Sequence, residues 1–327
     1  MAFKVTSQNK SEASDAPKID YAALNQYVVN TCDLQDQTTL NGYVATLVDL
    51  GEQEQEDAEM LFVGTAEDEA AEIEKNPNTY FKDSVNETTK KPERLKCWPQ
   101  KPKQAVAFGI DFPDIQLDKG QFFGDDSGDT KPLRLWLGGS FFMGKDIGMV
   151  VARPTFLKIT KKTGKWSLDA KHVAYQMAVA SKLIKPGEVF MPENIDQLLG
   201  QTYQFSARVH MKESKGKSYY TEECKFIGAL GRGQSQFEPE TPLHLVQMDD
   251  DNAPEAVRYL PNHVVNTIKR ANNFEGSKLQ KQLEERYNQK EEIEEAPPAL
   301  KAPAAKVAKP AVKKPVVEED DLSDSPF

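Results

Sequence analysis

The sequence contains no long apolar run. Nowhere in its 327 residues does a window approach the roughly 18 consecutive apolar residues of a membrane-spanning helix, which argues against an integral membrane protein. The N-terminal segment also has no apolar signal core, so we do not expect secretion. Apolar side chains make up 39% of the chain, below the roughly 45–50% of ordinary soluble domains, a figure that also counts glycine. Part of the chain is therefore expected to remain unpacked.

Cysteine and histidine are scarce as well. The three cysteines, Cys32, Cys97 and Cys224, form no CxxC pair, and we expect them to be reduced thiols in a cytosolic chain. The four histidines do not cluster with cysteines or carboxylates at zinc spacing, so we predict no metal site and no cofactor. The chain also lacks a GxxxxGKS/T motif, a GxGxxG motif that opens a helix, and HExxH. These absences favour a protein that is not an enzyme.

Charge is unevenly distributed along the chain. Acidic residues outnumber basic ones by 51 to 41. Residues 1–74 carry a net charge of −13, residues 75–245 of +7, and residues 246–327 of −4. A basic centre between acidic ends can bind nucleic acid and can also be shielded by those ends. The same lysines would keep a β-rich domain soluble, and charge alone leaves both interpretations open.

Alternating apolar side chains predict five strands in the middle of the chain. They are Thr39–Leu50, Ala105–Phe112, Leu133–Leu137, Thr202–Met211 and Ser218–Ile227. In the first strand, one face is expected to hold four residues: Val44, Thr46, Val48 and Leu50. A further candidate strand, Met149–Thr160, ends in a hairpin signal at 161–166.

The order of these elements is that of a small barrel. A helix over Asp169–Leu183 and a short helix over Pro192–Leu199 separate the third strand from the fourth. Three strands, a helix and two strands are the order of an OB-fold, a five-stranded and partly open barrel. We therefore predict a mainly β, α+β protein whose OB-fold spans residues 39–230. An acidic insertion at 52–74 and a long polar connection at 75–102 follow the first strand.

The segments on either side of the barrel differ from it in composition. Residues 1–38 are predicted to be a flexible N-terminal arm with a short helix over Asp20–Val29, and residues 231–295 a helical extension. Residues 296–317, rich in Pro, Ala, Val and Lys, cannot bury a core and are predicted to be a disordered linker. Residues 318–327 form an acidic tip that ends in Pro-Phe.

The tip is the most specific feature of the sequence. A terminal phenylalanine offers one ring and one α-carboxylate, which a partner can hold in an apolar pocket rimmed by Arg or Lys, and the acids before it raise the encounter rate. We predict that five residues of the tip dock to a protein: Asp320, Asp321, Asp324, Pro326 and Phe327. The same acids can compete with nucleic acid for a basic groove.

With this tip, the chain resembles bacterial and phage single-stranded DNA-binding proteins, which join an OB-fold to a linker and a Phe-ended acidic tip. The body is similar to phage members in four stretches: Gly42–Gln53, Lys103–Phe112, Leu198–Gln201 and Tyr203–Phe226. The resemblance implies a non-catalytic protein that coats single-stranded DNA in viral replication, recombination and repair. It also implies a location in the cytoplasm of an infected bacterium and a partner among polymerase, helicase or primase, and it leaves homo-oligomers open. The insertion lies where the loop after the first strand would contact DNA.

Pattern selects the residues expected to contact bases and phosphates. Arg134 and Trp136 alternate with Leu133, Leu135 and Leu137 and are expected to project outward together. The others lie on a strand end and hairpin, on the fourth strand and on the turn after it: Lys158, Lys161, Lys162, Lys165, Trp166, Arg208, His210, Lys212, Lys215 and Lys217. Burial of the two tryptophans and simple solvation of the hairpin lysines are the alternatives.

Two other functions are compatible with the sequence. An acidic scaffold or interaction protein of the replication machinery would suit residues 1–74 but not the basic centre. A metal-dependent nuclease could use loop carboxylates such as Asp125-Asp126 or Asp249–Asp251, although these lie beside Gly or Asn in stretches typical of solvated turns. Titration with oligo-dT at two salt concentrations and a magnesium-dependent cleavage assay separate the three functions.

Overall fold

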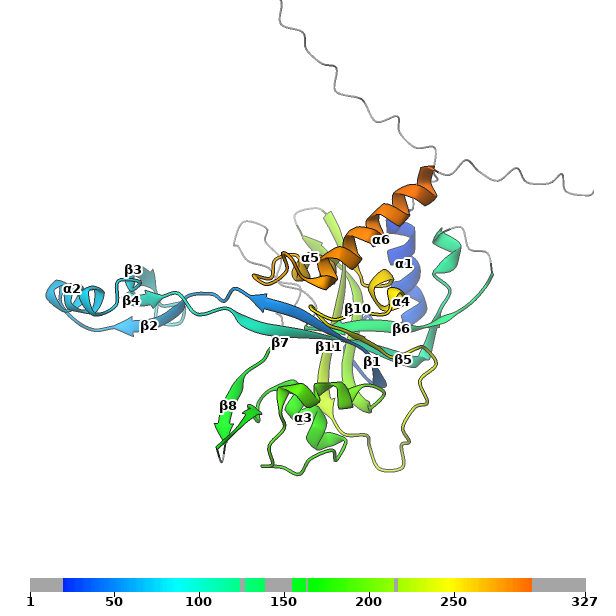
Figure 1. The fold of residues 1–327 in the computed structure, drawn as a ribbon, viewed down its shortest axis with the longest axis horizontal. Coiled ribbons are helices and arrows are strands. Elements are labelled where there is room, and N and C mark those ends of the chain that lie inside the picture. The colour runs from blue at the N-terminus through cyan, green and yellow to red at the C-terminus, as the bar shows by residue number, and fades with distance from the viewer. Residues whose placement is uncertain (1–19, 124–126, 139–154, 163, 215–216, 296–327) are drawn as a thin grey trace, which may run out of the picture.

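The protein is a mixed α+β molecule dominated by antiparallel strands (Figure 1). The computed structural model describes residues 20–123, 127–138, 155–162, 164–214 and 217–295. The main sheet has the strand order β11–β10–β1–β5–β6, and each neighbouring pair on this path is antiparallel. Its members match the five predicted strands: β1 (Thr38–Gln53), β5 (Lys103–Leu117), β6 (Lys131–Leu137), β10 (Thr202–Ser214) and β11 (Lys217–Gly228). Two short strands, β7 (Thr155–Phe156) and β12 (His244–Val246), pair with β5 and β1.

The main sheet is curved, so that its two end strands approach each other. Cα atoms of β6 and β11 lie within 8 Å, although no hydrogen-bonded ladder joins these strands among the described residues. The described strands therefore do not form a closed barrel, and the OB-fold stays a prediction. Between β6 and β10 in the chain lie α3 (Val173–Ala180) and the 3-10 helix η2 (Pro192–Leu198), so the two predicted helices exist and the first is shorter than expected.

A bulge in β1 makes this strand contribute to two apolar cores. Its register against β5 shifts between Val44 and Thr46. Val44 packs into the first core, whereas Val48 and Leu50 pack into the second. Our prediction that these residues share one face is wrong, because side chains alternate with a period of two and one inserted residue inverts all that follow.

The first core lies within the curve of the sheet. Val106, Phe108, Ile110 and Phe112 of β5 all point into it, as their alternation predicts. α1 (Tyr21–Cys32), which begins where the Asp20 carboxylate accepts two backbone N–H groups at 3.0 Å, packs on this core. α3 and η2 also pack on this core. The residues that the three helices bury in it are Val28, Val29, Cys32, Ala174, Tyr175, Met177, Ala178, Ile195 and Leu198.

The second core lies on the other side of β1 and β5. Ala105 and Ala107 of β5 join Val48 and Leu50 beneath three helices, α4 (Pro254–Arg258), α5 (Asn262–Ile268) and α6 (Lys278–Glu295). These helices lie across the sheet from α3 (Figure 1). Their buried side chains include Val257, Val264, Val265, Ile268, Leu279 and Leu283. The predicted helical extension therefore exists, and it shares a core with the sheet.

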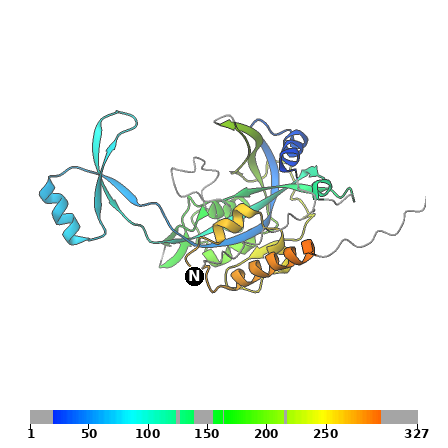
Figure 2. The same ribbon diagram turned by 90° about the horizontal axis from the view of Figure 1, so that it is seen from above.

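Residues 54–102 form a small folded unit that projects from the body in both views (Figures 1 and 2), and we call it the insertion subdomain. Its elements are β2 (Ala58–Phe62), α2 (Ala66–Lys75), β3 (Tyr80–Val85) and β4 (Pro92–Trp98), with the strand order β2–β4–β3. The predicted long connection over 75–102 is thus wrong. Two cations of β4 pair with acids of α2: Arg94 donates two hydrogen bonds to Glu69, at 2.8 and 3.0 Å, and Lys96 pairs with Glu72.

Candidate nucleic-acid interface

The hairpin predicted at 161–166 is formed by β8 (Ile159–Lys162) and β9 (Lys165–Leu168). Its base is fixed to the body, because the Leu168 N–H donates to the Phe190 carbonyl at 2.8 Å. Ser167 Oγ accepts the Phe190 N–H at 3.1 Å, and Ser167 and Leu168 are buried. This base holds a two-stranded ribbon, which has little stability of its own, in a defined place. Residues 139–154, which include the start of the predicted strand Met149–Thr160, lie outside the described residues.

The β8–β9 hairpin carries an exposed aromatic ring and an exposed cation, which are neighbours in the chain. Trp166 is 62% exposed, and Lys165 beside it is also exposed. Lys161 is the backbone partner of Trp166, and Lys162 is the partner of Lys165, while the side chains of these two lysines lie outside the described part. An exposed indole beside lysines is an arrangement that can stack a base and hold its phosphate.

Two other predicted lysines lie at or beside strand ends, and a third falls outside the described residues. Lys158 precedes β8 and is exposed, and its Nζ lies 3.7 Å from the Asp169 carboxylate. Lys215 lies outside the described residues. Lys217 begins β11, and only its backbone is described. Among the described residues, Lys217 pairs with Ser214 at the end of the β10–β11 ladder.

The outer face of β10 carries Arg208, His210 and Lys212, as predicted. The alternation is confirmed by the inner face, whose residues are fully buried: Tyr203, Phe205, Ala207 and Val209. Arg208 donates from Nε to the Gln35 carbonyl at 2.7 Å and lies opposite Glu223 of β11. Lys212 is exposed. Of the described side chains on this face of β10, Lys212 is exposed, and Arg208 is engaged by the Gln35 carbonyl.

His210 does not add a positive charge at neutral pH. Partial burial lowers its pKa below the ordinary value, the charge of Arg208 lowers it further, and Glu223 acts in the opposite direction. Lys225, which the sequence analysis missed, is exposed and lies opposite Ser206 on the same face of the β10–β11 pair. Its alternation with Glu223 along β11 is the signal that could have identified it.

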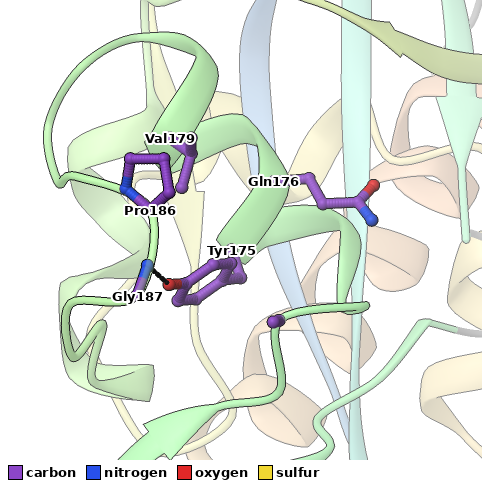
Figure 3. A pocket seen from close by; sticks show the side chains of 6 residues that line it. Tyr175, Gln176, Val179, Pro186 and Gly187 are labelled. Atoms are coloured by element: carbon purple, nitrogen blue, oxygen red, sulfur yellow. Dashed lines mark hydrogen bonds between the residues drawn. The ribbon is translucent and has the colours of Figure 1, made fainter.

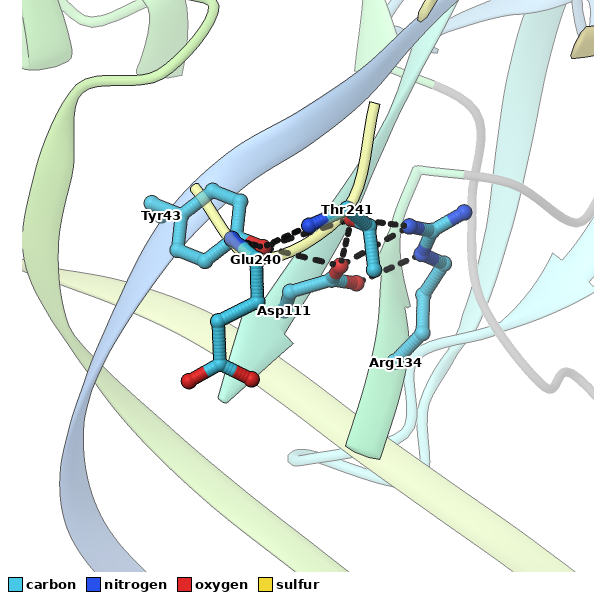
Figure 4. Close-up of polar contacts among 5 residues, drawn as sticks. All are labelled: Tyr43, Asp111, Arg134, Glu240 and Thr241. Carbon is cyan, nitrogen blue, oxygen red and sulfur yellow. Dashed lines mark hydrogen bonds and ion pairs between the residues drawn. The ribbon is translucent and has the colours of Figure 1, made fainter. Parts of the chain in front are cut away.

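Arg134 is partly buried and is held by a buried carboxylate. Its Nε and Nη2 donate to the two carboxylate oxygens of Asp111 at 2.5 and 2.8 Å, and the Asp111 side chain is fully buried (Figure 4). Thr241 Oγ1 donates to the same carboxylate at 2.7 Å, and the Tyr43 hydroxyl accepts the Glu240 N–H at 3.1 Å. This network joins β1, β5 and β6 to the chain before β12. A guanidinium held in this way is not a free cation for phosphate.

Trp136 packs beside the second core. Its ring centroid lies 6.2 Å from that of His263 on α5, with the two rings nearly perpendicular. Leu133 and Leu135 on the opposite face of β6 are fully buried, so the predicted alternation is confirmed. The side of β6 that we expected to be open is occupied by a helix from far along the chain. Intramolecular packing thus engages Trp136, as it does Arg134.

A shallow pocket of about 290 Å³ lies between α3 and the turn that follows it (Figure 3). Its walls are largely apolar and include Ala170, Val179 and Pro186. The Tyr175 hydroxyl at this pocket accepts the Gly187 N–H at 2.9 Å and donates to the Glu188 carbonyl at 3.1 Å. The tyrosine therefore closes the turn, and the pocket presents only one free side-chain amide, that of Gln176.

No metal centre or membrane span emerges from the described part of the chain. There, no group of three or more His, Cys, Asp and Glu side chains is arranged to hold a metal ion. None of its helices is both long and apolar enough to cross a membrane. The predicted docking residues of the C-terminal tip lie outside the described residues. Comparison with known proteins finds no matching family model, no similar curated protein and no similar solved structure.

Proposed function

We propose that the protein binds and coats single-stranded DNA during viral replication, recombination and repair in an infected bacterium, without catalysis. The observation that carries this proposal is the exposed Trp166 on a lysine-bearing hairpin whose base is fixed to the body. Stacking of one base on such a ring is worth about 1–3 kcal/mol and tolerates any sequence, because every base has a π-face. The lysines add a salt-dependent attraction to phosphate.

The strand order supports an OB-fold as the frame of this interface. With β1, β5, β6, β10 and β11 taken as strands one to five, strand one pairs with two and four, strand two with three, and strand four with five. Strands three and five approach each other. A five-stranded, partly open Greek-key barrel has these neighbours. α3 lies between strands three and four in the chain, where this fold places its helix.

The covering elements redirect the DNA away from the face that OB-folds use. That face is formed by strands two and three, with the loops one–two and four–five beside it. Here the second core covers β5, and the Arg134–Asp111 network engages β6. The proposed path instead follows the β8–β9 hairpin and the outer face of β10 and β11, where Lys212 and Lys225 are exposed.

The insertion subdomain supports a second function, contact with another protein. It occupies the position of the loop one–two, but Lys82, Arg94 and Lys96 are each paired with an acid of the same unit. It exposes several large apolar side chains, which are Met60, Leu61, Val63, Ile73, Tyr80 and Val85. Exposed apolar groups gathered on a projecting unit are typical of protein contact surfaces. This surface would add to DNA binding and does not replace it.

Replacing Trp166 with alanine tests the main proposal. Trp166→Ala is expected to weaken binding to oligo-dT by about 5- to 150-fold, since one stacking partner is lost. Fluorescence anisotropy at two salt concentrations measures this, with duplex DNA and RNA of equal length as competitors. Ile159→Ala is the matched control, because Ile159 is exposed on the same hairpin and has no π-face, so its affinity is expected to stay near wild type.

Two results would contradict the proposal in different ways. If the wild-type protein does not bind oligo-dT at low salt, single-strand binding is wrong. If the wild type binds with a steep salt dependence and Trp166→Ala binds equally well, the hairpin is not the contact surface and the DNA lies elsewhere.

A further inference from the structure

A second exposed ring lies near two cations, away from the β8–β9 hairpin in the sequence. Tyr259, at the end of α4, is 60% exposed. The Lys131 Nζ, at the start of β6, lies 5.5 Å from the centroid of this ring, and the Arg258 Cζ lies 5.9 Å from it. The fold thus places an aromatic face and two positive charges together, in a group that the sequence analysis did not identify.

The ring is mounted on a fixed support. Val257 and Leu260, on either side of it in the chain, are buried in the second core. Arg286 of α6 donates hydrogen bonds to the carbonyls of both residues, each at 3.1 Å. The Tyr259 N–H donates to the Glu255 carbonyl at 3.3 Å. Because the backbone is already ordered, a ligand that stacks on the ring loses little affinity to ordering it.

No carboxylate of the described residues forms an ion pair with either of the two cations. Within the part of the chain that the structure describes, neither Lys131 nor Arg258 has a carboxylate oxygen within 4 Å. Both side chains are exposed. In this they differ from Arg94, Lys96 and Arg134, which all form ion pairs. A polyanion that approaches Tyr259 therefore meets two available positive charges.

We propose that Tyr259, Lys131 and Arg258 form a second contact for single-stranded DNA, an inference that rests on the proposed function. A base stacks on the exposed face of Tyr259, and the two cations meet the phosphates beside that nucleotide. The flexible stem of Lys131 allows its ammonium to move from the ring to a phosphate. The ligand is an unpaired strand, because the bases of a duplex are already stacked on one another. The alternative is that the three residues form only a surface cation–π contact. Substituting them would then change protein stability and leave DNA affinity unchanged.

The ring is tested with substitutions at Tyr259 and at a matched tyrosine. Tyr259→Ser is expected to weaken oligo-dT binding by about 5- to 150-fold, and Tyr259→Phe, which keeps the ring, to bind like wild type. Tyr21→Ser is the control, because Tyr21 is also 60% exposed and has no cation near its ring among the described residues. Thermal unfolding of each variant separates loss of binding from loss of fold.

The cations are tested through the salt dependence. Each phosphate contact on a single strand contributes about 0.7 to the slope of log affinity against log salt. Lys131→Gln with Arg258→Gln is therefore expected to make the slope shallower by about 1.4, whereas Tyr259→Ser leaves the slope near the wild-type value and lowers the affinity at every salt concentration. The double substitution does not alter the buried support of the ring.

The outcomes separate this inference from the proposed function. If the wild type does not bind oligo-dT, both fail. If the wild type binds, and Tyr259→Ser and the double cation variant bind with its affinity and slope, the second contact is wrong and the proposed function stands. If Tyr259→Ser unfolds, the test rests on the salt dependence of Lys131→Gln with Arg258→Gln. A slope equal to that of the wild type then overturns the second contact.

Discussion

At the scale of single residues, a buried carboxylate determines what an arginine can do. Asp111 has no exposed surface, and its oxygens accept hydrogen bonds from Arg134, Thr241 and, at 3.4 Å, the Tyr43 hydroxyl. A buried charge is tolerated only while its partners are in place. Arg134 therefore stabilises the sheet and the chain before β12, although the alternation of β6 alone assigns it to the surface.

Removing the Arg134 side chain is expected to destabilise the fold strongly. Arg134→Ala should lower the free energy of unfolding by about 3–5 kcal/mol, because it leaves the Asp111 carboxylate buried without its cation. Adding Asp111→Asn should restore part of this loss, since a neutral amide is less costly to bury. Urea unfolding of the three proteins measures both effects. A stable Arg134→Ala protein with a shallower salt dependence of DNA binding would contradict this role and would indicate that Arg134 contacts DNA.

At the scale of elements, α3 depends on a neutral histidine at its start. His172 Nδ1 accepts the Ala174 N–H at 3.1 Å, which requires that nitrogen to be unprotonated. Burial lowers the pKa of His172 to about 4, while the backbone of Phe156 and the charge of Asp169 act in the opposite direction. As the pH falls, the unfolded chain takes up a proton near 6.5 and the folded one near 4. The contribution of neutral His172 to the free energy of unfolding is therefore fully present above pH 6.5 and is lost as the pH falls from about 6.5 to about 4.

His172→Asn is expected to flatten this part of the pH dependence. Asparagine caps a helix through its side-chain oxygen and does not titrate, so the start of α3 is kept. Between pH 7 and pH 5 the wild type should lose about 2 kcal/mol more of its unfolding free energy than the variant. Urea unfolding at several pH values provides the comparison, and equal losses in the two proteins would exclude His172 as the group responsible.

Strands that line an apolar core could be predicted from the sequence, and strands whose faces carry paired charges could not. Phe108 and Ile110 of β5 and Phe205 of β10 alternate with smaller or polar residues because one side of each strand lines the first core. In β4, by contrast, Arg94 and Lys96 occupy the face that meets α2, where Glu69 and Glu72 pair with them. Read locally, those charges indicate a solvated connection, and only the tertiary pairing shows a sheet.

The sequence predicted which kinds of side chain form the candidate site, but not which of them are exposed to solvent. Trp136 and Trp166 both lie in short strands beside cationic residues, so the local pattern treats them alike. A helix far along the chain packs against Trp136, and none of the described elements covers Trp166 to the same extent. Tyr259 was missed for the same reason, because Lys131 reaches it only through the fold.

At the scale of the whole molecule, the acidic tip is proposed to act on proteins and not on the DNA interface. Deleting Leu322–Phe327 should abolish recruitment of replication proteins and should not weaken oligo-dT binding. Co-precipitation with polymerase, helicase and primase, together with the anisotropy titration, measures the two effects. Phe327→Ala is the matched control, since it keeps every acid and removes only the terminal ring. A clear loss of DNA affinity in the truncated protein would contradict this division of roles.

The second core limits where the protein can be truncated. Val48, Leu50, Ala105 and Ala107 lie under α4, α5 and α6, so a fragment that stops at residue 230 would present this apolar strip to water. Such a fragment is expected to aggregate. Weak DNA binding by that fragment would therefore say nothing about the whole chain. A truncated protein that keeps the second core covered should end at Glu295, the last residue of α6, and omit the composition-biased residues that follow it.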